Sequence, residues 1–153
     1  MALFADANQH LIDSTLSIAY LIKPLRRLKY LSLTSLLLDD NIQDSTFYNL
    51  QTLQFLNFSN NHFVNLSSRV FDQLVHLKIL DLSFNKINSI REELMNKLMN
   101  ISSLEAIYFN DNPWSCTRCE VLPMKLWINT SPASYYNVCR HNSASASTST
   151  SAS

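Results

Sequence analysis

The sequence has 153 residues, of which 46% are hydrophobic and 16% are charged, and its formal net charge is zero. A chain of this length can bury the core of one domain, and without an excess of basic residues it has no cationic stripe for nucleic acid. Glycine is absent, which excludes the glycine-rich loops that bind phosphates and dinucleotides. No apolar run has the length of a membrane span.

Residues 1–27 form an irregular N-terminal segment, for which two interpretations stand open. In the first, one side of a helix that ends before Pro24 carries Ile12, Leu16, Ala19, Tyr20 and Lys23. In the second, the segment is the convex half of a degenerate repeat, whose apolar positions are Ile18, Leu21, Leu25 and Leu28. The segment does not read as a signal peptide, because Asp6 and Asp13 interrupt its apolar residues.

Residues 28–112 contain one phrase in four copies. The copies read LKYLSL at 28–33, LQFLNF at 53–58, LKILDL at 77–82 and, more weakly, LEAIYF at 104–109. Three of the copies are followed by an asparagine, namely Asn61, Asn85 and Asn112. A period in the twenties with the pattern LxxLxLxxN is typical of a leucine-rich repeat solenoid. The chain therefore resembles that family, and we expect an α/β solenoid with parallel strands on its concave face.

Alternation within each phrase assigns the side chains to two faces. Leu56, Leu80 and Leu82 are predicted to point inward and to be buried, while Phe55 and Asn57 point outward. The three asparagines follow the strands, where their amides can bond backbone groups that no ladder satisfies. Because Leu36 stands at the equivalent place in the first copy, we expect the asparagine series to begin at Asn61. The return segments match as well, with Phe47 and Phe71 each six positions before the next phrase.

Residues 113–141 resemble the C-terminal cysteine cap of extracellular leucine-rich repeat proteins. The resemblance is carried by Asn112-Pro113-Trp114, by Cys116 and Cys119, and by Cys139 after a stretch that contains Trp127. That family includes Toll-like receptors, lamprey variable lymphocyte receptors and insect immune repeat proteins. The resemblance implies a disulfide between Cys116 and Cys139 and a Trp114 that packs against the last repeat. The first cysteine pair is spaced CxxC, where the family has CxC.

The family's fourth cysteine is missing from this sequence. Cys119 is therefore left unpaired or forms a dimer through a bond between chains. Two other interpretations of the cysteines stay open. Cys116, Cys119, Cys139 and His141 offer a tetrahedral zinc set, and reduced thiols would suit an intracellular repeat. We favour the cap and expect no metal and no cofactor. Residues 142–153, almost entirely Ser, Ala and Thr, are expected to be a disordered tail.

Four N-x-S/T sequons are glycosylation candidates, at Asn57, Asn65, Asn100 and Asn129. Glycans would suit a secreted protein with few charges, although a chain rich in Asn, Ser and Thr holds some sequons by chance. Asn57 lies within a predicted strand, which is a poor setting for an acceptor. No catalytic constellation is visible, since the four histidines are scattered. We therefore expect that the protein is not an enzyme.

The outward strand residues are the candidate binding site, and we call the surface that they form the concave face. They are Tyr30, Ser32, Phe55, Asn57, Ile79, Asp81, Phe84, Tyr108 and Asp111. Its apolar members would form a stripe of the kind that marks protein interfaces, although Phe84 could instead pack within its turn. The family resemblance implies a secreted or cell-surface receptor of innate immunity whose concave face binds a protein or pathogen-derived ligand. The alternative is an intracellular scaffold of the same architecture.

Overall fold

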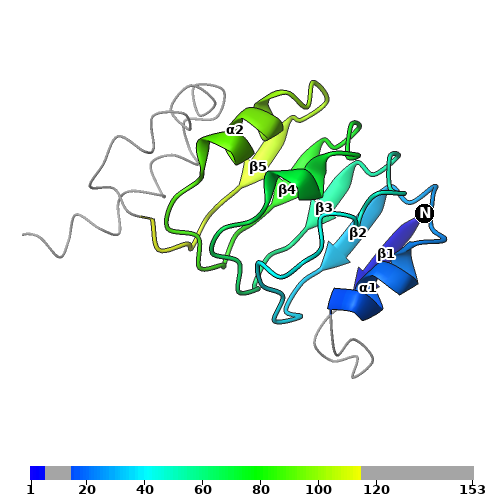
Figure 1. Ribbon diagram of the computed structural model, residues 1–153, viewed down its shortest axis with the longest axis horizontal. Coiled ribbons are helices and arrows are strands. Elements are labelled where there is room, and N and C mark those ends of the chain that lie inside the picture. Colours follow the sequence, from blue (N-terminus) through cyan, green and yellow to red (C-terminus); the bar gives the residue numbers. More distant parts are fainter. Residues whose placement is uncertain (6–14, 115–153) are drawn as a thin grey trace, which may run out of the picture.

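The computed structural model describes residues 1–5 and 15–114 as a solenoid with one five-stranded parallel sheet. The strands lie side by side in chain order (Figure 1). They are β1 (Ala2–Ala5), β2 (Tyr30–Leu33), β3 (Phe55–Asn57), β4 (Ile79–Asp81) and β5 (Ala106–Tyr108). The expected α/β solenoid with parallel strands on one face is confirmed.

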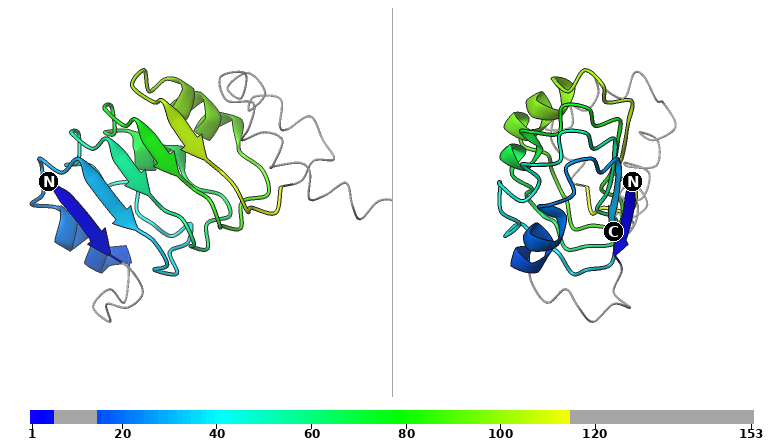
Figure 2. Two further views of the ribbon diagram at one scale, coloured as in Figure 1. Left: turned by 180° about the vertical axis from the view of Figure 1, so that it is seen from behind. Right: turned by 90° about the vertical axis from the view of Figure 1, so that its right-hand side faces the viewer.

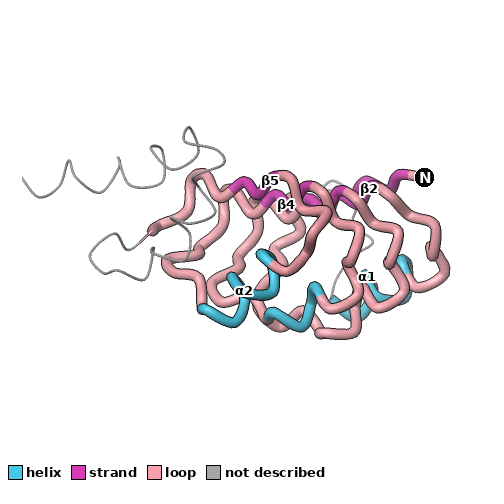
Figure 3. The backbone as a smooth tube through the Cα atoms, turned by 90° about the horizontal axis from the view of Figure 1, so that it is seen from above, coloured by secondary structure: helices cyan, strands magenta, loops and turns pink. Residues whose placement is uncertain are grey.

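The opposite side of the solenoid carries the helices. These are α1 (Thr15–Ile22), the 3-10 helix η1 (Ser68–Phe71) and α2 (Glu92–Met99). Seen from the end and from above, the strands occupy one wall and the helices the other (Figures 2 and 3). Glu92 and Glu93 in the first turn of α2 and Lys97 in its last complement the helix dipole. Ser67 caps η1 by accepting a hydrogen bond from the N–H of Arg69.

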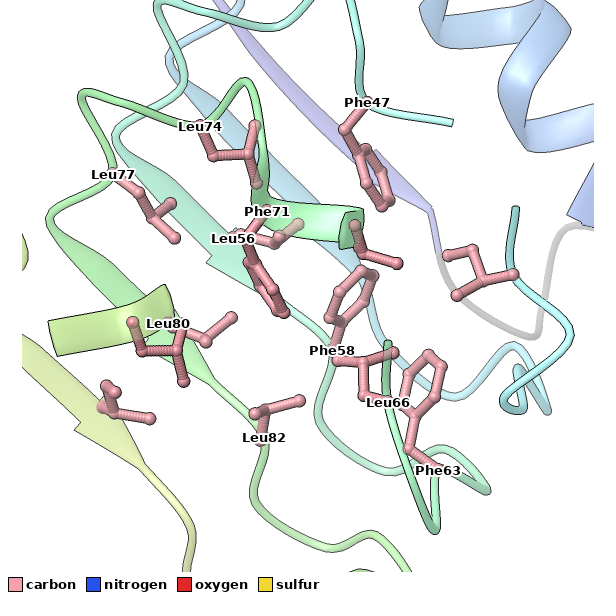
Figure 4. Close-up of a cluster of buried hydrophobic side chains, with 14 of the residues drawn as sticks. Phe47, Leu56, Phe58, Phe63, Leu66, Phe71, Leu74, Leu77, Leu80 and Leu82 are labelled. Atoms are coloured by element: carbon pink, nitrogen blue, oxygen red, sulfur yellow. The ribbon is translucent and has the colours of Figure 1, made fainter. Parts of the chain in front are cut away.

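The core is a stack of apolar layers between the two walls (Figure 4). Equivalent strand residues stand in register, so that Leu31, Leu56, Leu80 and Ile107 form one inward row. The prediction that Leu56, Leu80 and Leu82 are fully buried is confirmed. The return segments contribute the matching layers Phe47 with Leu50 and Phe71 with Leu74.

The N-terminal segment adds a strand and a helix before the first phrase. β1 pairs with β2 and extends the sheet by one strand, a strand that the sequence pattern does not predict. The helix α1 ends before Pro24, as one interpretation proposed. Among the side chains that the structure describes in this helix, Ile18 and Ile22 are buried, whereas Tyr20 and Leu21 are exposed. Each of the two interpretations thus describes part of the segment.

Asparagine side chains connect successive turns at the end of the sheet. Asn85 donates from Nδ2 to the carbonyl oxygens of Leu82 in its own turn, at 3.1 Å, and of Phe58 in the preceding repeat, at 3.0 Å. Its Oδ1 accepts the N–H of Phe63 at 3.1 Å. The same pattern recurs at Asn61 and Asn112. Each amide therefore satisfies buried backbone groups of two repeats at once.

Candidate functional site

No helix or loop of the described residues covers the concave face (Figures 2 and 3). Its side chains fall into register rows that run across the strands. The first row contains Tyr30, Phe55, Ile79 and Ala106. The second row contains Ser32, Asn57, Asp81 and Tyr108. Parallel pairing sets equivalent residues about 5 Å apart, so each row is continuous.

The first row is apolar for most of its length. Tyr30 is exposed and Phe55 and Ile79 are half-buried. The rings of Tyr30 and Phe55 lie with their centroids 6.3 Å apart and tilted by 36°, a favourable arrangement for two aromatic side chains. Ala106 ends this row, because the aromatic side chain of β5 belongs to the second row.

The second row is polar and ends in an exposed aromatic side chain, Tyr108. Asn57 is half-buried, and its Oδ1 accepts the N–H of Ser59 at 2.7 Å. Asp81 does the same for Ser83 at 2.9 Å and also bonds the hydroxyl of that serine. One oxygen of each side chain therefore fixes the turn that follows the strand. Ser32, at the start of this row, is buried.

A third row follows at the turns, where the backbone is left-handed. Ser35, Asn60, Phe84 and Asp111 have φ values of 59°, 55°, 54° and 56°. Glycine or asparagine usually occupies such positions, and a bulky side chain there is an outlier. Phe84 is 56% exposed, so its ring points away from the turn and does not pack within it. The apolar members of the candidate site therefore lie in three different rows. They do not form the single stripe that the sequence predicted.

An exposed ion pair joins the residues just before the last two strands. Lys78 Nζ lies 2.8 Å from Glu105 Oε1. The hydrogen bond to the Glu105 carboxylate, and next its charge, raises the pKa of Lys78. Within the described part of the chain, no group of three or more His, Cys, Asp and Glu side chains is placed to hold a metal ion. No helix there is long and apolar enough to cross a membrane.

The sequon asparagines differ in their surroundings. Asn65 and Asn100 are exposed, and neither belongs to a strand. Asn100 follows the last turn of α2. Asn57, by contrast, lies on the concave face with its side chain already hydrogen-bonded. Asn129 lies outside the described residues.

Of the expected cap at residues 113–141, only Pro113 and Trp114 belong to the described residues. Trp114 is buried and meets the ring of Phe109 edge-on, with centroids 5.5 Å apart. Its Nε1 donates to the carbonyl oxygen of Phe109 at 3.1 Å. The prediction that Trp114 packs against the last repeat is therefore confirmed. Cys116, Cys119, Cys139 and His141, with the tail at 142–153, lie beyond the described part.

Comparisons with known proteins agree with this architecture. The family model described as "Leucine rich repeat" matches residues 26–87. Mouse Toll-like receptor 7 is 30% identical over 120 residues, which cover 70% of this chain and 11% of the receptor. Trophoblast glycoprotein of Macaca fascicularis is 29% identical over 79 residues, covering 52% of this chain and 18% of that protein. Human leucine-rich repeat-containing protein 70 is 32% identical over 65 residues, covering 42% of this chain and 10% of that protein. The chain thus spans less than a fifth of the length of these relatives.

Proposed function

Because the chain belongs to the leucine-rich repeat family, we propose that it is a non-enzymatic binding module that holds a protein or pathogen-derived ligand on its concave face. The observation that carries this proposal is the pair of rows on an uncovered sheet. Tyr30, Phe55 and Ile79 supply apolar anchors, and Asp81 and Tyr108 supply hydrogen-bonding groups beside them. Interfaces concentrate their binding energy in such aromatic anchors at the centre of a patch.

The rigidity of this surface favours binding as well. The side chains stand on strands in register, and the turns after them are fixed by Asn57, by Asp81 and by the three asparagine amides that follow the strands. A preformed surface loses little conformational entropy when it meets a partner. We therefore place the binding energy in the described strands, with Lys29 and Lys78 at the rim acting mainly on the association rate.

We further propose that the chain is part of a secreted or cell-surface protein of innate immunity. Support comes from the cap resemblance after Trp114 and from two relatives named as a receptor and a glycoprotein. Glycans at Asn65 and Asn100 would leave the concave face free, since neither asparagine belongs to a strand. Such glycans would also add solubility to a surface with few charges.

In the test, the wild-type chain and its variants are each used to capture binding partners from secreted proteins and from microbial extracts. Phe55→Ala and Tyr108→Ala remove one anchor from each row, and Val75→Ala truncates an exposed apolar side chain outside the strands. Truncating a central anchor typically weakens binding by about tenfold or more. We expect quantitative mass spectrometry to find partners kept by the wild type and by Val75→Ala and lost by the two concave-face variants.

Two results would overturn the proposal. In one, folded Phe55→Ala and Tyr108→Ala retain the same partners as the wild type. In the other, Val75→Ala loses them to the same extent, which would place the contact outside the concave face.

A further inference from the structure

Four basic side chains lie close together in the short segment between α1 and β2. They are Lys23, Arg26, Arg27 and Lys29, and we call them the basic patch. All four are exposed, whereas Leu28, which stands among them, is fully buried. The buried leucine anchors the segment to the core and leaves the cations at the surface. A formal net charge of zero for the whole chain therefore does not exclude a local accumulation of positive charge.

The basic patch is built on a turn that recurs in each repeat. In the first repeat, the N–H of Leu28 donates to the carbonyl oxygen of Leu25 at 2.9 Å. The later repeats make the same bond, from Leu53 to Leu50, from Leu77 to Leu74 and from Leu104 to Ile101. Each turn comes just before a strand of the parallel sheet. The four turns therefore form one edge of the solenoid, where the strands begin.

The first of these turns is the one that is rich in charge. Its two inner residues are Arg26 and Arg27, and Lys29 follows it. The inner residues of the later turns are Gln51 and Thr52, Val75 and His76, and Ser102 and Ser103. Because these turns form the same backbone bond without arginine, the fold does not require the charges of Arg26 and Arg27. The charges are thus available for binding.

The positive charge of the patch is not neutralised by the described part of the chain. The salt bridges among residues 1–5 and 15–114 join Lys78 to Glu105 and Lys97 to Asp72, and neither involves the basic patch. Glu105 is the one carboxylate within the four turns and the residues that follow them, and it is already paired. A group of uncompensated cations raises the local positive potential and attracts polyanions.

Hydrogen bonds to the next repeat hold the backbone of the patch in place. Thr52 Oγ1 donates to the carbonyl oxygen of Arg26 at 3.1 Å. Asn49 Nδ2 donates to the carbonyl oxygen of Lys23 at 3.4 Å. The turn is therefore preformed, so a ligand that binds there has less conformational entropy to remove.

The surroundings of the patch favour one class of polyanion. The next turn places the amides of Gln51 and Gln54 beside it, and amides donate and accept hydrogen bonds as sugar hydroxyls do. No Phe, Tyr or Trp stands in any of the four turns, and the ring of Tyr30 lies against Phe55 on the concave face. Single-stranded nucleic acids are held by bases stacked on aromatic side chains, and these turns offer none. Arginine binds oxyanions through two parallel N–H bonds.

We propose that the basic patch binds a sulfated polysaccharide of the cell surface or the extracellular matrix. Sulfate groups meet Arg26, Arg27 and Lys29, and sugar hydroxyls bond the amides of the next turn. The choice of a sulfated sugar rests in part on the extracellular location proposed above. Apart from Lys29 at the rim, however, the patch shares no residue with the concave face, so the two binding proposals can fail independently.

The test measures the affinity of the full chain for a heparin oligosaccharide of defined size by isothermal titration calorimetry. Desulfated heparin, which keeps its carboxylates, tests the need for sulfate. Polyglutamate and single-stranded DNA of similar charge test whether any polyanion suffices. We expect heparin to bind at least about fivefold more tightly than each of these, with a slope of about three for the fall of log affinity with log salt. Equal affinity for any of the three comparison compounds would overturn the proposal.

A double variant removes the charge and keeps the turn. Arg26→Gln with Arg27→Thr gives the first turn the side chains that Gln51 and Thr52 supply in the second. We expect this variant to bind heparin at least about tenfold more weakly and to halve the salt slope roughly. Its Tm should stay within about 4 °C of the wild type, because both side chains that it replaces are exposed.

A matched control removes the same amount of charge elsewhere. Lys86→Gln with Arg91→Gln neutralises two exposed cations outside the four turns, and its affinity for heparin should change by less than about twofold. Tyr108→Ala, on the concave face, should bind heparin as the wild type does. If the turn variant fails to fold, Lys29→Gln, which copies Gln54 of the next repeat, should bind about threefold more weakly.

Three results with the variants would overturn the proposal. In the first, the folded turn variant, or Lys29→Gln in its place, binds heparin as the wild type does. In the second, the control pair loses as much affinity as the turn variant, which would reduce the effect to net charge. In the third, Tyr108→Ala loses heparin binding, which would place the sugar on the concave face.

Discussion

At the scale of single residues, the asparagine amides contribute stability out of proportion to their size. We predict that Asn85→Ala lowers the free energy of unfolding by about 3 kcal/mol, because it leaves the N–H of Phe63 and the carbonyl of Phe58 without their buried partner. Urea unfolding measures the change. Asn88→Ala, at an exposed asparagine three residues on, should change the free energy by less than about 0.5 kcal/mol. Equal losses for both variants would contradict the role given to the amide.

Phe84, by contrast, is expected to destabilise the fold, because its left-handed backbone conformation costs free energy and its exposed side chain buries little apolar surface. Three equivalent turns place Ser35, Asn60 and Asp111 at the same left-handed φ. We predict that Phe84→Asn raises the free energy of unfolding by about 1 kcal/mol, because asparagine tolerates this region better than phenylalanine. Thermal unfolding measures the shift, with Phe55→Asn as the control that should not stabilise. A destabilised Phe84→Asn would mean that the ring makes a stabilising contact.

The asparagine series could be predicted from the sequence, whereas the left-handed turns could not. The spacing after each phrase marked Asn61, Asn85 and Asn112 directly. The left-handed residue is different in each of the four turns, where it precedes Leu36 or one of the three asparagines, and none is glycine. The left-handed conformation at Phe84 follows from the hydrogen bond of its N–H to Asn110 in the next repeat, at 2.8 Å. Local propensity carries no signal for such a tertiary constraint.

At the scale of elements, the strands stabilise the solenoid through their inward aliphatic side chains. We predict that Leu80→Ala lowers the free energy of unfolding by about 2–5 kcal/mol, because it opens a cavity beneath β4 in a fully packed layer. Chemical denaturation measures the loss. Gln54→Ala, at a half-buried polar position before β3, should cost less than about 1 kcal/mol. If the two variants lose equal stability, the assignment of inward and outward positions is wrong.

The strands of residues 28–112 follow from the repeated phrase, but the strand and the helix at the N-terminus do not. The four residues of β1 are too few to show an alternation, and their strand exists because the edge of β2 offers hydrogen bonds. For α1, the sequence predicted that a helix ends before Pro24, but it offered two different sets of apolar residues for the buried side. Packing on the first full repeat buries Ile18, from the second set, and Ile22, which belonged to neither set. Contact with a neighbouring repeat decides both elements, and such contacts are not local in sequence.

At the scale of the whole molecule, the two sides of the solenoid differ in what the sequence could predict. Alternation within each phrase identified the concave face, although the pairing register was needed to place Tyr108 beside Asp81 and away from Ile79. The burial of Thr46 was not predicted, because a threonine in a return segment is ordinary in the sequence. Only the three-dimensional arrangement shows that its hydroxyl is buried and has no hydrogen-bond partner among the described residues.

The C-terminal end of the stack has to be closed. A solenoid exposes an apolar layer at each end unless something covers it, and Trp114 already lies over Phe109. Cys116 follows two residues later, so a disulfide to Cys139 would fix the chain across that layer. We predict that peptide mapping of secreted material, without reductant and with free thiols blocked by alkylation, recovers a peptide that links Cys116 and Cys139. Recovery of free Cys139 or of one zinc per chain would contradict the cap pairing and remove the best support for an extracellular protein.

A disulfide between Cys116 and Cys139 would also leave Cys119 without a partner in its own chain. With three cysteines in the chain, pairing of Cys116 with Cys139 leaves one thiol that can link two chains. We expect wild-type protein to run as a dimer on a gel without reductant and as a monomer with it. Cys119→Ser should run as a monomer in both conditions and keep the thermal stability of the wild type. Cys139→Ser should lower the Tm, since it opens the cap and not the link between chains. A dimer that survives Cys119→Ser would show that the linking thiol, and therefore the cap pairing, has been assigned wrongly.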